Sequence, residues 1–503
     1  MTKNVRRTDV ARAAIAASLL VTLLAPAATH AEDASQAEEI RALRQRVEQL
    51  EKALLELQRD RERPATDATT SSDAAAGGAA DEGAGEASAA SQKKSATHKT
   101  AAAEDKPNVT AGYKDGFFLG TGDGGYKLQI GGYGQVDSRW ALDHHGRDIN
   151  DGFFIRRARI DVRGTLAEHW DFRIRPDFAG SSLTLLETYV DTKFSPAAVL
   201  RIGKTTTPFG LERLQSGSHL PIMERSLADN LVPNRDIGAH FFGDVADEVF
   251  SYQAGVFNGA PDGGSAEANF NDGVDVVARV FAHPWKATPV EALHGFGLGL
   301  AGTYGEHQGT TSSPQLPQFR TSSRSAFFRY RSDDATFADG THWRVSPQAY
   351  YYFGPFGAMG EYVHSSQELR RGAVHGTTAN DAWQARVSYV LTGEDASYKA
   401  VVPAQPFDFG RGGWGAWEIA ARISSLDVDD DAFRLGFADP EAAATQADAY
   451  TLALNWYLNK NVAFYLDYEH SEFKGGRGAI APRVAPANRR DEDVFLTRMQ
   501  FVF

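Results

Sequence analysis

The chain has 503 residues, a formal net charge of −13 and no cysteine, which excludes a disulfide framework, a thiolate metal site and a cysteine nucleophile. Its mean hydropathy is −0.37, and no apolar run beyond the N-terminal region is long enough for a spanning helix. A soluble secreted protein and a β-barrel, which gives only alternate residues to lipid, both fit these values. The negative charge alone argues against anion binding, but net charge does not describe how charges are arranged inside a lumen.

The N-terminus predicts a cleaved signal peptide over residues 1–31. Four basic residues precede an apolar run over 13–25: Lys3, Arg6, Arg7 and Arg12. Thr29-His30-Ala31 then provides the small residues that precede a cleavage site. An uncleaved anchor helix is the weaker alternative, because the run is shorter than the ~20 residues that span a bilayer.

Residues 32–62 are predicted to form a short periplasmic coiled-coil helix. Apolar residues recur there at alternating spacings of three and four, as in an a/d seam: Ile40, Leu43, Val47, Leu50, Leu54 and Leu57. The alternative is a single amphipathic helix that packs on another element. Residues 63–112 contain almost no large apolar side chain, so they cannot offset the entropy of ordering and are predicted to be a disordered linker.

Residues 113–503 predict an all-β, antiparallel transmembrane barrel of about 16 strands (16–18). The pattern gives 17 candidate strands, or 18 if 116–120 is one. Because single-chain bacterial barrels use an even number, a count of 17 means that one strand is split or missed. Segments such as Trp383 to Leu391 and Tyr450 to Leu458 alternate apolar and polar side chains with a period of two. A soluble sandwich would show the same period. The signal peptide, the strand count and a chain that ends on the aromatic Phe503 favour the barrel.

The connections between these strands fall into two classes. Gly354-Pro355 and Asn459-Lys460 are predicted to be short periplasmic turns. The long connections, over 204–234, 307–322 and 394–413, are predicted to be extracellular or folded into the lumen. Four tryptophans near strand ends are expected on the lipid-facing side, as in interfacial girdles: Trp140, Trp170, Trp383 and Trp456.

Arginines are concentrated on the early strands of the predicted barrel: Arg156, Arg157, Arg159, Arg163, Arg173, Arg175 and Arg201. With a period of two, Arg157, Arg159 and Arg163 share a face with Asp161. One interpretation is a cationic ladder along a pore wall, because guanidinium groups match phosphate and carboxylate and rings of arginine select anions. The other is a wall of arginine–aspartate pairs whose charges cancel.

The segment over 204–234 is the second candidate functional element. Loops longer than ~12–15 residues without secondary structure are usually functional or disordered, and this one carries apolar anchors, so it is expected to pack on something. Folded into the barrel, it would narrow the pore and its cations would set the field at the constriction: Lys204, Arg213, Arg225 and Arg235. The alternatives are an extracellular cap and a loop that contacts another subunit of a trimer.

Four short motifs in this region resemble the phosphate-selective porin O and P family. They are Phe153 to Arg159, Pro208 to Glu212, Glu224 to Ser226, and Arg235 to Gly238. The resemblance extends from about Gly116 to Phe503. It implies a 16-stranded trimeric outer-membrane porin whose third loop folds inward, and, in phosphate-selective members, lumenal arginines with lysines at the constriction.

This chain departs from that pattern in two places. Tyr133 stands where such members often have an arginine, and no lysine lies between Lys204 and Lys286, so selectivity for phosphate stays open. Arg156 and Arg157 occupy the positions of the family's paired arginines. The period of two directs only Arg157 inward, although a β-bulge or a strand end near the loop would turn both toward the lumen.

We therefore expect a Gram-negative outer-membrane porin that passes small anions, phosphate or related oxyanions, by passive diffusion. A weakly selective general porin and a structural tether acting through the coiled coil are the alternatives. Enzyme activity is not expected, because neighbouring pairs such as Ser218-His219 face opposite ways on a strand. The histidines show no metal-ligand spacing, and no cofactor or nucleic-acid site is expected. The expected partners are small anions, outer-membrane lipid and two further copies of the chain.

Overall fold

The computed structural model describes residues 109–142, 151–268, 273–333, 335–475 and 491–503. All of them belong to one compact unit, Ala102–Phe503. The predicted signal peptide, the coiled-coil helix and the linker up to residue 108 lie outside the described residues. None of the helices described there is long and apolar enough to cross a membrane.

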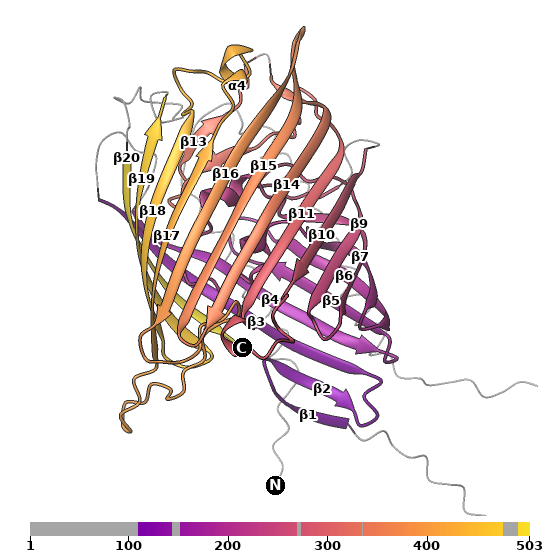
Figure 1. Ribbon diagram of the computed structural model, residues 1–503, viewed down its shortest axis with the longest axis vertical. Helices are drawn as coiled ribbons and strands as arrows, with labels where there is room; N and C mark the ends of the chain where they lie inside the picture. The colour runs from indigo at the N-terminus through magenta and orange to yellow at the C-terminus, as the bar shows by residue number, and fades with distance from the viewer. Residues whose placement is uncertain (1–108, 143–150, 269–272, 334, 476–490) are drawn as a thin grey trace, which may run out of the picture. The chain divides into compact units, whose positions relative to one another are not determined.

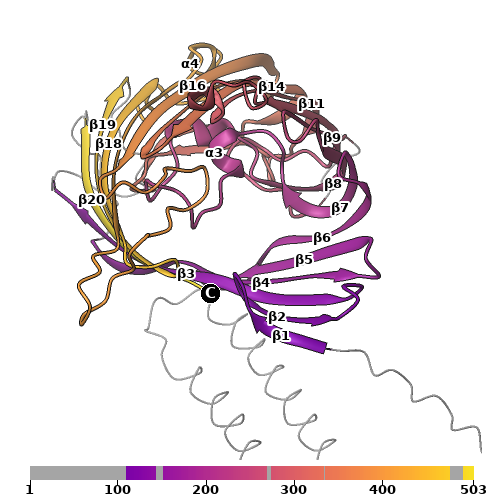
Figure 2. The same ribbon diagram turned by 60° about the horizontal axis from the view of Figure 1, so that its bottom comes forward.

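Sixteen antiparallel strands close into a barrel (Figures 1 and 2). In chain order they are β3 (Lys127–Ala141), β4 (Gly152–Leu166), β5 (Trp170–Asp177), β6 (Thr184–Ser195), β7 (Ala198–Thr206), β8 (Arg235–Val245), β9 (Phe250–Phe257), β10 (Asp275–Ala282), β11 (Phe296–Gln308), β14 (Phe337–Phe353), β15 (Phe356–Arg371), β16 (Val374–Val390), β17 (Ala416–Asp427), β18 (Gln446–Tyr457), β19 (Val462–Lys474) and β20 (Asp491–Val502). Each pairs with its neighbour in the chain, and β20 pairs with β3 from Val494↔Ala141 to Val502↔Tyr133. The predicted barrel is confirmed.

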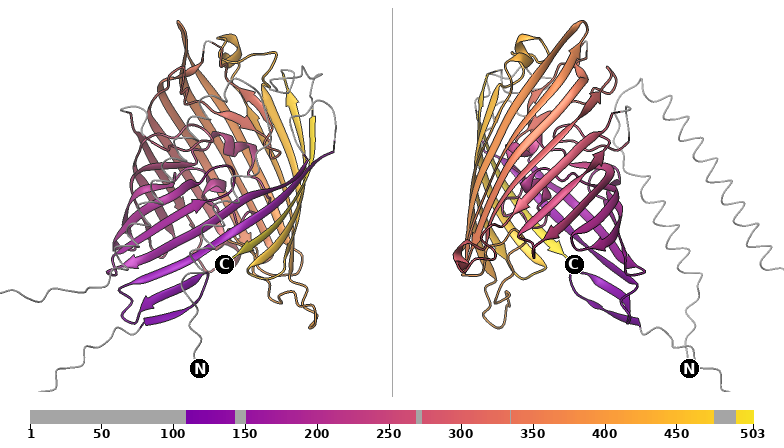
Figure 3. Two further views of the ribbon diagram at one scale, coloured as in Figure 1. Left: turned by 180° about the vertical axis from the view of Figure 1, so that it is seen from behind. Right: turned by 45° about the vertical axis from the view of Figure 1, so that its right-hand side comes forward.

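Two further strands explain the surplus in the predicted strand number. β1 (Val109–Tyr113) and β2 (Phe117–Thr121) form a hairpin whose second strand pairs with the start of β3. This hairpin adds to the sheet without joining the closed ring, as Figure 3 shows at the end of the barrel that holds the C-terminus. β1 also begins within the region predicted to be linker, because Val109 and Thr110 are β-branched residues that a hairpin accommodates.

The barrel has one end with short turns and one with long connections. Gly354-Pro355, the 458–461 turn and Phe503 share the first end, as predicted. The 391–415 connection between β16 and β17 also lies there, although its predicted place was extracellular or inside the lumen. The reason is strand direction: β16 runs from the long-connection end toward the short-turn end. Part of the connection does enter the barrel, where Tyr398 stacks on Tyr350 with ring centroids 5.5 Å apart.

Apolar side chains cover the outside of the wall. Ile174, Val190 and Leu452 are among the exposed large residues, and Trp140, Trp170 and Trp383 are about 40% exposed on this face. In water such a surface would be costly, at roughly 25 cal/mol for each Å² of apolar area. The alternation therefore directs apolar residues to lipid, with polar residues facing the lumen.

Part of the lumen is filled by apolar packing. The 207–234 connection, with α3 (Leu211–Leu214) and the 3₁₀ helix η1 (Leu227–Leu231), lies inside the ring of strands in Figure 2. Its residues Phe209 and Leu231 belong to one buried cluster with Phe319 and Phe328 from the 309–336 connection, which forms the hairpin of β12 (Gln318–Arg320) and β13 (Ala326–Arg329). The prediction that the long segment packs on something is confirmed, and it leaves the lumen only partly open.

Candidate functional site

The open part of the lumen is a cavity of about 1030 Å³. It lies between strands β4–β8 on one side and the 207–234 segment on the other. All seven arginines predicted for the pathway line this cavity, and so do three of the four predicted constriction residues. The fourth, Lys204, is buried and forms an ion pair with Glu267, so its charge is directed away from the cavity.

A β-bulge decides the orientation of the paired arginines. Gln135 pairs with Arg157, whereas the next residue of β3, Val136, pairs with Ile155, so Arg156 is the extra residue on β4. Arg156 forms an ion pair with Glu224 of the 207–234 segment. Arg157 donates to Gln135 Oε1 at 2.7 Å. Both side chains face the lumen, which is the alternative that simple alternation left open.

Carboxylates pair with several arginines of the wall. Arg159 lies 2.7 Å from Asp177, and Arg201 lies 2.7 Å from Asp191. Glu187 is shared by three guanidinium groups, at 3.4 Å from Arg173, 3.2 Å from Arg175 and 3.3 Å from Arg235. Arginine–carboxylate pairs are therefore present on this wall, as the interpretation of a wall with cancelling charges required.

Cations nevertheless outnumber acids around the cavity. Of the described residues, twelve arginines and two lysines line it, against five carboxylate side chains. Adding Asp177 and Asp191, which pair with lining arginines, still leaves twice as many cations as acids. Arg157 and Arg163 have no ion pair with a described carboxylate. Because charges interact strongly in a narrow, partly dehydrated passage, this excess favours anions.

The 207–234 segment is held in place from the opposite wall by side chains that bind its backbone. Glu361 of β15 accepts from the Leu211 amide at 2.7 Å, and Asp467 of β19 accepts from the Met223 amide at 2.7 Å. Asn455 of β18 donates to the Pro221 carbonyl at 2.8 Å. These bonds satisfy backbone groups that a buried loop would otherwise leave unpaired. The segment is thus fixed inside the lumen by the opposite wall.

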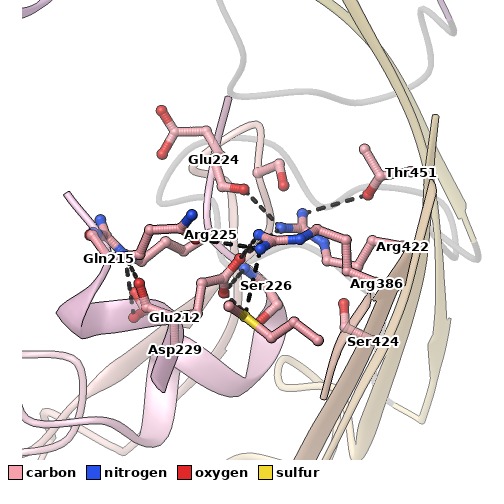
Figure 4. A network of polar contacts seen from close by, with 12 residues as sticks. Glu212, Gln215, Glu224, Arg225, Ser226, Asp229, Arg386, Arg422, Ser424 and Thr451 are labelled. Carbon is pink, nitrogen blue, oxygen red and sulfur yellow. Dashed lines mark hydrogen bonds and ion pairs between the residues drawn. The ribbon is translucent and has the colours of Figure 1, made fainter. Parts of the chain in front are cut away.

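Figure 4 shows the centre of this attachment. Glu212 accepts hydrogen bonds from the Ser226 amide at 2.9 Å and its hydroxyl at 2.8 Å, and it pairs with Arg422 at 3.3 Å and Arg386 at 3.7 Å. Burial raises the pKa of the Glu212 carboxyl, but the two guanidinium groups and the Ser226 bonds outweigh it, and the pKa is lowered. Glu212 therefore stays ionised and joins the segment to β16 and β17.

The predicted constriction arginines are themselves engaged within the segment. Arg213 pairs with Asp229 and donates to Asn234 at 3.0 Å. Arg225 donates to the carbonyls of Glu212 at 3.2 Å and Gln215 at 2.8 Å. These hydrogen bonds stabilise the segment, and the Arg225 side chain still lines the cavity. Arg235 donates to both Glu187 and Asn234.

Four lining cations were not predicted from the sequence. Arg320 and Arg324 come from the β12–β13 hairpin, and Lys399 and Lys460 come from the short-turn end. The charge of Arg156, together with burial, lowers the pKa of Arg324. The available signal was the set of phenylalanines in the 309–336 connection, because apolar residues in a long loop indicate that it packs inside.

Tyr133 occupies the position where a cation was expected. Its hydroxyl accepts from Arg159 Nη1 at 2.6 Å, and the Arg159 guanidinium lies 5.5 Å from the ring centroid. Tyr133 therefore holds the Arg159 guanidinium in position, whereas an arginine at this place would have added a positive charge of its own. The nearby His219 contributes no charge at neutral pH, because burial and Lys399 both lower its pKa.

The chain is similar to several outer-membrane channels. Porin O of Pseudomonas aeruginosa is 26% identical over 436 residues, which cover 79% of this chain and 93% of that protein. Among solved structures, the channel DcaP of Acinetobacter baumannii has 12% identity and a TM-score of 0.49, covering 75% of this chain and 98% of that one. An anion-selective porin from Comamonas acidovorans has 12% identity and a TM-score of 0.46, covering 75% and 100%. A model of the phosphate-selective porin O and P family matches residues 128–503, more than half of the chain, and the chain therefore belongs to that family.

Proposed function

We propose that this outer-membrane porin passes small anions, phosphate or related oxyanions, by passive diffusion through the arginine-lined cavity. The observation that carries the proposal is the excess of cations over carboxylates around the open lumen. Arg157, Arg159, Arg163, Arg173 and Arg175 concentrate anions along the wall, and Arg213 and Arg235 contribute at the constriction. Binding has to be shallow and shared by several sites, since an ion that binds tightly would not leave.

The test is single-channel recording in a planar bilayer under a chloride gradient, followed by titration with phosphate. We expect a reversal potential on the anion side and a chloride current that millimolar phosphate blocks. Anion preference without block would remove phosphate from the proposal. A reversal potential near zero, or on the cation side, would overturn it in favour of a general porin with neutralised lumenal charges.

A charge variant links that result to the cavity. Glu187→Gln removes the carboxylate that three arginines share, so it is expected to shift the reversal potential further to the anion side and to lower the phosphate concentration needed for block. Glu248→Gln is the matched control, since Glu248 pairs with Lys286 outside the cavity and its side chain is 70% exposed. Equal behaviour of both variants would mean that the wall does not set selectivity.

We further propose a homotrimer whose N-terminal residues 32–62 form a periplasmic coiled coil. Two features support it. β5, β9 and β10 have eight residues each, fewer than the ~9–11 that a tilted spanning strand needs. The side of the barrel that these short strands form therefore suits contact with another subunit better than contact with lipid. β1 begins at the short-turn end, which is periplasmic in barrels of this class.

A cysteine test addresses the trimer and the periplasmic placement together. Leu50→Cys introduces the sole thiol of the chain, at a predicted seam position. Periplasmic oxidation is expected to give covalent dimers within a complex whose mass in detergent is three chains. Exclusively monomeric chains, by mass and by cross-linking, would contradict the trimer.

A further inference from the structure

The hairpin added to the barrel ends in a tip, residues 113–116, that turns toward the lumen. Lys114-Asp115-Gly116 joins β1 to β2, and Asp115 and Gly116 have positive φ angles of 53° and 121°. A Cβ at Gly116 would lie 2.8 Å from the Ile130 carbonyl oxygen, so glycine allows the tip to press against β3. A Cβ at Gly131 would lie 2.8 Å from a backbone oxygen of Phe503 and 3.5 Å from the Asp115 carbonyl oxygen, so the tip also lies close to Gly131.

Three parts of the barrel hold the tip in this position. Gln129 of β3 donates to the carbonyls of Lys114 at 2.7 Å and Asp115 at 2.9 Å. Arg163 of β4 donates to the Asp115 carbonyl at 3.1 Å. Asn461, in the β18–β19 turn, donates to the Tyr113 hydroxyl at 2.7 Å. A hairpin that only extended the sheet would not need side-chain bonds from three separate strands and turns.

The tip also borders the ion path. Tyr113 and Asp115 line the cavity together with Lys460 and Phe503, which belong to the short-turn end. The Lys460 ammonium lies 5.2 Å from the Tyr113 ring centroid. Asp115 is exposed and none of the described cations forms an ion pair with it, so no paired cation neutralises its carboxylate at this mouth.

We propose that the 113–116 tip is the exit rim of the conduit and that Asp115 is a selectivity-determining residue there. Its carboxylate opposes the accumulation of anions beside Lys460 and Lys399. An anion that has passed along the arginine-lined wall is thereby released more readily. A lumen lined by many positively charged side chains requires this, because an anion that binds too tightly would not leave. The role of Asp115 in anion release rests on the proposed anion conduction. The effect of its charge on the reversal potential can be measured whatever the selectivity of the unmodified porin.

The first experiment is Asp115→Asn, recorded in bilayers beside Asp123→Asn. Asp123 is the matched control, because it lies in the neighbouring β2–β3 turn, bonds to Thr121 and Gly125, and does not line the cavity among the described residues. Asp115→Asn is expected to move the reversal potential to the anion side and to lengthen phosphate block. Asp123→Asn is expected to match the unmodified porin.

A second experiment uses the absence of cysteine from the chain. Asp115→Cys and Asp123→Cys each carry a single thiol, which is labelled from the short-turn side with a sulfonate-bearing or a trimethylammonium-bearing methanethiosulfonate reagent. At position 115 the anionic label should reduce anion selectivity and the cationic label should raise it. At position 123 both labels should leave the current unchanged.

The proposal is overturned if labelling at both positions is complete by mass and neither label alters the reversal potential at position 115, or if both positions respond alike. Failure of the proposed function looks different. In that case the unmodified porin is not anion-selective, whereas the two labels at position 115 still shift its reversal potential in opposite directions.

Discussion

Replacement of residues 211–231 by a short glycine–serine linker is expected to raise the single-channel conductance several-fold and to weaken phosphate block. The segment occupies the lumen, and its removal leaves the full ring of strands around a wider aqueous passage. The ends of the segment allow the change, because a Cβ at Gly210 would lie 2.6 Å from Val232 Cγ1. Gly210 and Val232 are therefore close enough to be joined by a short linker without moving β7 or β8.

The wall should tolerate this loss. Glu361, Asp467 and Asn455, which bind the backbone of the segment, would face water in the widened lumen and exchange their bonds for hydration. The control replaces residues 408–412, an exposed stretch at the short-turn end that does not line the cavity among the described residues, and should keep the native conductance. A folded 211–231 variant whose conductance stays native would show that the segment does not constrict the passage.

The fold and one wall of the site were predictable because both depend on a period of two. That period directs Arg157, Arg159 and Arg163 to one face, and the structure brings them to the same cavity. The bulge at Arg156 was not placed by the period of two, although an extra residue shifts the phase of alternation. Phe153 and Ile155 are exposed on the outer face before the bulge, and Ile160 is exposed after it. The resemblance of the paired arginines to those of the family was the signal that both could face the lumen.

The partners of the arginines were harder to predict than the arginines. Glu224 reaches Arg156 across 68 positions of sequence, and no local pattern relates the two. The two interpretations of the arginines also turned out to be compatible. Asp161 and Glu187 do pair with Arg173 and Arg175, yet cations from three other connections restore the excess of positive charge. Predicting that balance requires knowing which loops enter the barrel, which is a property of packing.

Replacement of Asp137 by asparagine is expected to lower the free energy of unfolding by about 3–5 kcal/mol, the usual cost of leaving a buried charge without its partner. Asp137 of β3 lies directly opposite Arg498 of β20, so the pair bridges the seam at which the barrel closes. Two bonds join the groups, at 2.8 and 2.7 Å, and both side chains are at most 2% exposed. Among the described residues, the other carboxylate that forms an ion pair with Arg498 is Glu224, which is 3.5 Å away and is shared with Arg156.

Urea unfolding in lipid vesicles, followed by tryptophan fluorescence, measures this effect. Asp431→Asn is the control, because Asp431 forms an ion pair of similar length with Arg434, whose side chain is 71% exposed. Exposed pairs contribute at most ~1 kcal/mol. The double variant Asp137→Leu/Arg498→Met should recover part of the loss, since it removes both charges together. It should not recover all of it, because Arg498 also donates to the Met223 carbonyl at 2.9 Å and so holds the constriction segment. Equal unfolding midpoints for Asp137→Asn and Asp431→Asn would mean that strand pairing alone closes the barrel and that the charges at its seam serve only the lumen.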